Sequence, residues 1–125
     1  MASTHKNDLS GLEYAVPSLR GLPNTQRAIV HKYADDADRV LTEMRRVISD
    51  TGRLVLVLGD SCLRGVDVPT SNIFAWLAGK NDFVLTGEER RDIPHNHRYL
   101  PINSASHSLS KRMRQETVQI YVPAN

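Results

Sequence analysis

Runs of apolar residues separated by turn residues divide the chain into a small number of helices and strands. Residues 54–58 read Leu-Val-Leu-Val-Leu, and glycine-containing turns precede and follow them. A short uninterrupted run of this kind is typical of a strand buried on both faces. We therefore predict a strand over Arg53–Leu58. We expect functional residues just after it, at Gly59–Arg64, because ligands of open parallel sheets bind outside the carboxyl ends of the strands. A turn without chemistry is the alternative.

The stretch before this strand has helical periodicity. Its apolar residues recur every three or four positions and form one stripe of a predicted helix over Asp35–Ser49. Three aspartates fall in the predicted first turn, where the helix dipole favours negative charge: Asp35, Asp36 and Asp38. Residues 1–33 have no such pattern, and we predict an irregular lead-in with a short helix around Thr25–Tyr33.

Further elements follow the strand. Pro69-Thr70-Ser71 offers a cap for a helix over Ser71–Ala78, and Phe83–Glu89 is predicted to be a strand. Residues 91–110 are expected to be mostly loop. Glu116–Val122 is the last predicted strand, with Val118, Ile120 and Val122 on one face. This order predicts an α/β fold in which the last strand is antiparallel.

Composition limits the class of protein. With 125 residues, 40% apolar and 24% charged, the chain makes one ordinary globular domain at most. Cys62 is the only cysteine, so no internal disulfide forms, and a small apolar role is favoured over a reactive thiol. No apolar run approaches the roughly 20 residues of a membrane span, and the N-terminus has no apolar signal core. We expect a cytoplasmic protein that does not enter a membrane.

Positive charge is concentrated in residues 90–115. This segment holds six arginines and lysines against a single aspartate, whereas the rest of the chain is slightly acidic. It also contains Tyr99 and three histidines. A basic segment of this kind either contacts nucleic acid phosphates or forms a solvated loop.

Three short blocks resemble the serine hydrolases known as GDSL or SGNH hydrolases. The blocks are Gly59-Asp60-Ser61, Gly79-Lys80-Asn81-Asp82 and Asp92-Ile93-Pro94-His95. The resemblance implies Ser61 as nucleophile, His95 as base and Asp92 as its orienting acid, with Gly65 and Asn81 in an oxyanion hole. The spacing argues against it, since that family places several strand–helix units between its serine and its histidine.

A longer stretch, from about Ala34 to Val122, resembles the C-terminal half of a class I S-adenosylmethionine-dependent methyltransferase. The similarity is to DNA methylases that modify N4 of cytosine or N6 of adenine. Its segments occur in order and without a spacing conflict: Asp38–Val55, Gly59-Asp60-Ser61 with Arg64-Gly65-Val66, Pro69-Thr70-Ser71, Ile93-Pro94 with Arg98-Tyr99-Leu100-Pro101, and Leu109–Glu116. Ser49-Asp50-Thr51-Gly52 replaces the Lys-Pro-Gly-Gly turn that many members carry.

The resemblance implies the C-terminal portion of a Rossmann-like sheet in residues 34–125, with an antiparallel last strand and a basic loop on the substrate side. By this resemblance Asp60, Ser61 and Arg64 line a substrate cleft. The residues that would contact DNA, or alternatively RNA, are Arg98, Tyr99, Lys111, Arg112 and Arg114.

Other parts of the family pattern have no counterpart in the sequence. We find no Gly-rich cofactor loop, no acidic ribose ligand after a second strand and no Asp- or Ser-Pro-Pro-Tyr/Phe motif. We therefore assign no catalytic, metal-binding or cofactor-binding residue, and S-adenosylmethionine belongs to the complete enzyme. The chain is expected to be a truncated or split methylase, inactive alone, or else an inactive remnant. The edge of the Arg53–Leu58 strand should then pair with a complementary half or with a second copy.

Overall fold

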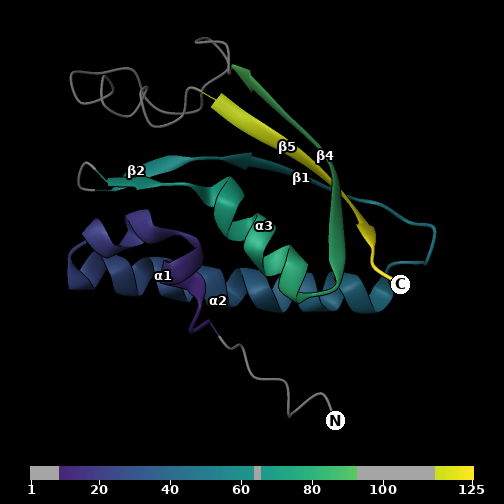
Figure 1. Ribbon diagram of the computed structural model, residues 1–125, viewed down its shortest axis with the longest axis horizontal. Coiled ribbons are helices and arrows are strands. Elements are labelled where there is room, and N and C mark those ends of the chain that lie inside the picture. The colour runs from purple at the N-terminus through teal and green to yellow at the C-terminus, as the bar shows by residue number, and fades with distance from the viewer. Residues whose placement is uncertain (1–8, 64–65, 93–114) are drawn as a thin grey trace.

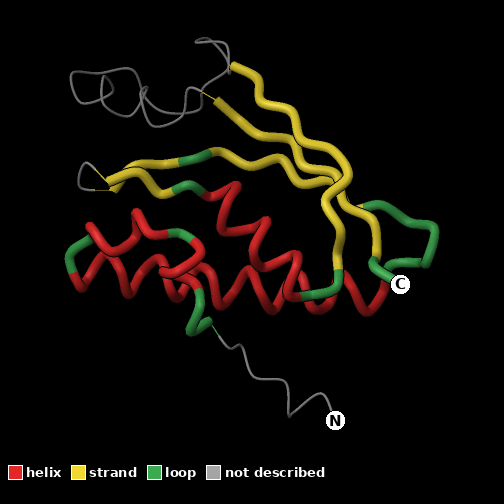
Figure 2. The backbone as a smooth tube through the Cα atoms, viewed as in Figure 1, coloured by secondary structure: helices red, strands yellow, loops and turns green. Residues whose placement is uncertain are grey.

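The computed structural model describes residues 9–63, 66–92 and 115–125. Helices lie on one side of a small antiparallel sheet, as Figures 1 and 2 show. The described elements occur in the order α1 (Leu12–Ala15), the 3-10 helix η2 (Pro17–Gly21), α2 (Asn24–Val47), β1 (Leu54–Gly59), β2 (Ser61–Leu63), β3 (Val66–Val68), α3 (Thr70–Lys80), β4 (Phe83–Asp92) and β5 (Gln115–Pro123).

The main sheet has the strand order β1-β5-β4, so β5 is central and β1 and β4 are its edges. Both pairings are antiparallel, which confirms the predicted direction of the last strand. A register shift between Leu85 and Gly87 marks a bulge in β4. Among the described strands, β1 therefore has a hydrogen-bonded neighbour on one side only.

The two faces of β1 differ, which contradicts the prediction of a strand buried on both faces. Leu58 is buried and Leu54 and Leu56 are partly buried, whereas Val55 and Val57 are each 55% exposed. The reason is that the helices cover only the leucine side, and no described element covers the valine side (Figure 1).

The central strand β5 turns its polar side toward the helices. Thr117, Gln119 and Tyr121 are at most 3% exposed. The apolar face predicted for this strand exists, but its residues are only partly buried: Val118, Ile120 and Val122. The buried polar groups are satisfied, since the Tyr121 hydroxyl donates to Gln119 Oε1 over 2.7 Å and Gln119 Nε2 donates to the Ser71 carbonyl oxygen over 3.0 Å.

Helix α2 is one continuous helix of 24 residues, where the sequence suggested two. No glycine or proline interrupts residues 24–47, so the short helix and the longer one join. The three aspartates assigned to a first turn therefore lie in the middle of the helix, and the explanation from the helix dipole is wrong. Asp35 and Asp36 instead pair with Arg39 and Lys32, and Asp38 accepts a hydrogen bond from Asn81.

The stretch predicted as irregular supplies much of the core. Residues 12–21 form α1 and η2, and four apolar side chains in or beside these helices are at most 4% exposed: Leu12, Val16, Leu19 and Leu22. Pro17 begins η2 instead of breaking it, because the first residues of a helical turn need no N–H partner. Short helical pieces of this length have too little periodicity to be recognised in the sequence.

The remaining elements agree with the sequence within one to three residues at most ends. Helix α3 and strands β1, β4 and β5 all form where they were predicted. The segment after β1 differs, since Ser61–Leu63 and Val66–Val68 pair as an antiparallel hairpin where a loop was expected. Strand β3 lies against η2, and Val68 is buried in the core.

Candidate functional site

The carboxyl end of β1 is the candidate site, and Asp60 is its best-defined side chain. Asp60 directly follows β1, and its Oδ1 accepts a hydrogen bond from the backbone N–H of Ser71 over 3.1 Å. A carboxylate at this position satisfies one of the N–H groups at the start of α3 and interacts favourably with the helix dipole. Asp60 therefore caps α3 and holds its first turn at the end of β1. A cap was predicted from Pro69-Thr70-Ser71, but the residue at the N-cap position is Pro69, which makes no side-chain capping hydrogen bond.

A buried polar network joins the start of α3 to the sheet. Gln119 Nε2 donates to the Ser71 carbonyl oxygen and also to Glu88 Oε2, over 2.8 Å. Burial and the neighbouring Glu88 carboxylate raise the pKa of Tyr121 to about 12. The bulge in β4 turns Glu88 to the helix side of the sheet, opposite Gln119. This network fixes the orientation of α3 beneath the candidate site.

The strand register brings the two strand ends that flank the basic segment to the same end of the sheet as the carboxyl end of β1. Gly59 of β1 and Arg91 of β4 both align with Glu116 of β5. Arg91 Nε also donates to a Glu116 carboxylate oxygen over 2.7 Å, and Gln115 Nε2 donates to Asp92 Oδ1 over 3.1 Å. Residues 92 and 115, which flank the segment 93–114, are therefore held side by side, close to the carboxyl end of β1.

The predicted site residues are described to different extents. Asp60 lies at the end of β1, and Ser61 is the first residue of β2. The others lie outside the described residues: Arg64, Arg98, Tyr99, Lys111, Arg112 and Arg114. The structure thus brings together the end of β1 and the two strand ends that flank the basic segment.

The oxyanion role assigned to Asn81 in the hydrolase alternative is wrong. Asn81 Nδ2 donates to Asp38 Oδ1 and to the Leu77 carbonyl oxygen, and its Oδ1 accepts from Thr42 Oγ1. It precedes β4, whereas Ser61 follows β1, and these positions lie at opposite ends of the sheet, roughly 25 Å apart at about 3.3 Å per residue. Asp92 is engaged with Gln115, and His95 and Gly65 lie outside the described residues.

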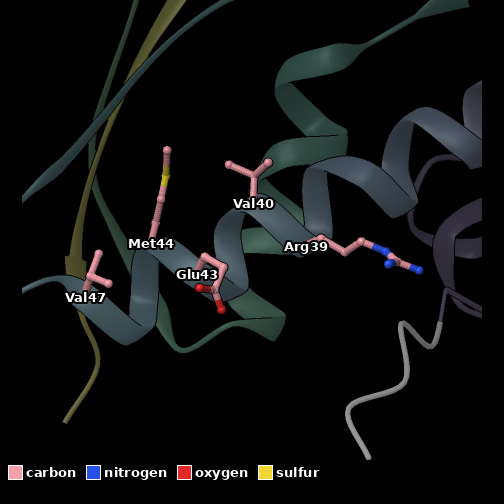
Figure 3. Close-up of a pocket in the computed structure, with 5 residues that line it drawn as sticks. All are labelled: Arg39, Val40, Glu43, Met44 and Val47. Atoms are coloured by element: carbon pink, nitrogen blue, oxygen red, sulfur yellow. The ribbon is translucent and has the colours of Figure 1, made fainter. Parts of the chain in front are cut away.

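A shallow apolar groove of about 440 Å³ lies on the outer surface of α2, away from the candidate site. Figure 3 shows the five side chains that line it. They are Arg39, Val40, Glu43, Met44 and Val47. The sequence did not reveal this surface, because Val40, Met44 and Val47 were assigned to the single apolar stripe of the helix predicted over Asp35–Ser49. The recurrence of apolar residues at 29, 33, 40, 44 and 47 was the signal that could have revealed it.

Two structures of one protein from Thermus thermophilus, assigned as a DNA modification methylase, are similar to this chain. The S-adenosyl-L-methionine complex has a TM-score of 0.56 and 20% sequence identity, over 77% of this chain and 39% of that chain. The selenomethionine derivative has a TM-score of 0.61 and 18% identity, over 89% of this chain and 50% of that chain. This chain therefore has a DNA methylase-like fold and spans half or less of the solved protein. A scan against protein-family models finds no match. A search of curated proteins finds none either.

The described residues do not fit S-adenosylmethionine by themselves. The seven glycines are dispersed, and the turn after β1 leads into a hairpin and not into a Gly-rich loop and helix. The start of α3, where backbone N–H groups could approach a ligand, already carries the Asp60 carboxylate. No group of three or more His, Cys, Asp or Glu side chains within the described ranges is placed to hold a metal ion. None of the helices described here is long and apolar enough to cross a membrane.

Proposed function

We propose that this chain is part of an S-adenosylmethionine-dependent methylase that acts on DNA. The likeness in fold to a methylase solved with that cofactor supports this. The observation that carries the proposal is the strand register, because it holds residues 92 and 115 beside the carboxyl end of β1. The most basic segment of the sequence starts and finishes there, next to Asp60.

In this proposal the chain forms the C-terminal portion of a Rossmann-like sheet and binds the DNA substrate. Asp60, Ser61 and Arg64 line the cleft for the target base, whose exocyclic amino group is N4 of cytosine or N6 of adenine. Arg98, Lys111, Arg112 and Arg114 contact backbone phosphates, and Tyr99 packs beneath them or stacks on a base.

The cofactor supplies the methyl group, and its pocket and the catalytic motif come from a complementary methylase segment, in the same polypeptide or in a separate one. That segment pairs with the free edge of β1. The described residues offer no cofactor loop of their own, which supports this division. The chain without that segment is accordingly inactive.

The experiment that tests DNA contact compares the wild-type chain with the double variant Lys111→Ala/Arg112→Ala. Each phosphate contact contributes about 0.9 to the slope of log affinity against log salt concentration. The variant should therefore bind duplex DNA more weakly and show a slope reduced by about two, measured by fluorescence anisotropy at several salt concentrations.

The matched control is Lys32→Ala/Arg39→Ala, which removes the same charge from exposed positions on α2. We expect this control to keep the wild-type salt slope. Equal slopes for wild type and for the Lys111→Ala/Arg112→Ala variant would refute the proposal. Stronger binding of single-stranded RNA than of DNA, lost in the same variant, would assign the segment to RNA.

A further inference from the structure

Helix α2 has a second apolar stripe that the core does not use. Its buried side packs into the core through Val30, Ala34, Ala37 and Leu41. Beside this buried side runs a second row of apolar residues, which we call the outer stripe: Ile29, Tyr33, Val40, Met44 and Val47. Met44 is partly buried, and the side chains of the other four are between 45% and 68% exposed. A helix that packs against the core on a single side needs a single apolar stripe. A second apolar stripe beside the first therefore indicates a second packing partner.

The outer stripe runs along most of the helix as two apolar patches, which are separated by the exposed Asp36 and its partner Lys32. The 24 residues of α2 extend about 36 Å at roughly 1.5 Å per residue. Val40, Met44 and Val47 project on the same side of the helix and line the groove described above, with Arg39 and Glu43 beside them (Figure 3). Toward the other end, Tyr33 contacts Phe74 of α3 edge-to-face, with ring centroids 6.1 Å apart. Apolar surface of this extent is typical of an interaction site.

The free edge of β1 carries the same apolar character. Its residues from Leu54 to Leu58 include no lysine or proline, the residues that commonly protect an edge strand from association. Met44 of α2 and Leu54 and Leu56 of β1 are all partly buried against the same core. Incompletely covered apolar side chains thus lie on both the helix and the strand at the border of the core.

We propose that the outer stripe of α2 is the docking site for an amphipathic helix of the complementary methylase segment. This inference rests on the proposed function and adds a second contact to the strand that pairs with β1. The methylase fold argues for this occupant, since half or more of the solved chains has no counterpart in this chain.

The charges beside the groove define the chemistry of the helix. Arg39 and Glu43 are exposed on α2 and flank the apolar side chains. Both already have partners on α2, Arg39 with Asp35 and Glu43 with Arg46, so the docking helix should present an apolar stripe with polar residues at its borders.

The test uses the part of the Thermus thermophilus methylase that has no counterpart in this chain, produced as a separate polypeptide and called the probe. Binding of the probe to the full 125-residue chain is measured by isothermal titration calorimetry. The double variant Val40→Glu/Val47→Glu should weaken binding at least tenfold. Both side chains are at least half exposed, so its thermal melting curve should match that of the wild type.

The matched control is Tyr14→Glu/Ala28→Glu, which adds the same charge at exposed positions outside the outer stripe. We expect it to bind the probe as the wild type does. If the stripe variant also binds like the wild type, the stripe is not a docking site, and the proposed function stands. If even the wild-type chain fails to bind the probe, both the proposed function and this inference are wrong.

A second copy of the chain is the competing occupant, and sedimentation equilibrium without the probe distinguishes it. We expect no dimer that depends on the outer stripe. A wild-type dimer that the Val40→Glu/Val47→Glu variant abolishes would assign the stripe to a second copy and overturn the proposal.

Discussion

At the scale of single residues, buried polar side chains serve to join elements. Asn81 is 8% exposed, and its amide nitrogen donates a hydrogen bond to Asp38 while its amide oxygen accepts one from Thr42. These two bonds connect the end of α3 to α2. Asp60 and Gln119 do the same between α3 and the sheet. Motifs of three or four residues suggested catalytic roles for the Asn81 and Asp60 blocks, but the hydrogen bonds of these two residues give them a structural part.

The variant Asn81→Ala should lower the free energy of unfolding by about 3 kcal/mol, because it removes the amide that donates to the buried Asp38 carboxylate and accepts from Thr42 Oγ1. Urea denaturation measures the change. Asn72→Ala, at an exposed position of the same helix, is the control and should change stability by less than about 0.5 kcal/mol. Equal stability of the two variants would contradict this role of Asn81.

At the scale of elements, the N-terminal helical pieces belong to the core and are held by charge as well as by packing. Glu13 of α1 lies 2.7 Å from His31 Nε2 and 3.3 Å from Arg27 Nε, both on α2. The hydrogen bond with His31, and then the charge of Arg27, hold the pKa of Glu13 below its usual value. This cluster orients α1 on α2.

The lowered pKa of Glu13 predicts how stability depends on pH. A carboxyl group with a lower pKa in the folded state stabilises the fold above its unfolded pKa, near 4.5, and loses this contribution as the pH falls through its folded pKa. The variant Glu13→Gln should therefore be less stable than wild type at about pH 6, and the difference should shrink below about pH 4.5. Thermal melts from about pH 3 to about pH 7 measure it.

The control for this experiment is Glu43→Gln. Glu43 pairs with Arg46 on the exposed surface of α2, where water screens the pair. Near neutral pH, the Glu43→Gln substitution should therefore change the free energy of unfolding less than Glu13→Gln does. A stability difference between wild type and Glu13→Gln that stays constant over the whole acidic range would exclude the proposed linkage.

At the scale of the whole molecule, the helices cover one face of the main sheet, and among the described strands β1 and β4 each have a hydrogen-bonded neighbour on one side only. Val55 and Val57 on the open face of β1 are as exposed as the outer stripe of α2. The solved methylase chains are at least twice as long as the portion that this chain matches. These observations agree with the proposed function, in which a complementary segment supplies the cofactor pocket.

The proposed function predicts that the chain alone does not bind S-adenosylmethionine. Calorimetric titration of the cofactor into the 125-residue chain should give no saturable heat at millimolar cofactor. The whole Thermus thermophilus methylase, which was crystallised with this molecule, is the positive control. Saturable binding by the isolated chain in the micromolar range would show that the described fold holds a cofactor site without a complementary segment.

Local pattern alone determined most of the helices and strands. The apolar run at 54–58, the alternation at 116–122 and the helical spacing at 71–78 each specify an element, because periodicity reflects contacts within a few residues. The sequence also indicated the antiparallel last strand and the basic segment. It misjudged the start of α2 and the helical pieces before it, where the periodic signal is short or masked by aspartates.

Only the tertiary structure decided which faces and edges are covered. The sequence indicated Val118, Ile120 and Val122 as the apolar face of β5, but the opposite face is the more deeply buried one. The helices pack on Gln119 and Tyr121 because Ser71 and Glu88, distant along the chain, supply their hydrogen-bond partners. The cap formed by Asp60 and the register that places residues 92 and 115 beside β1 likewise depend on contacts between distant segments, which leave no period in the sequence. The outer stripe of α2 does recur in the sequence, but only the packing of the helix shows that this side of it stays exposed.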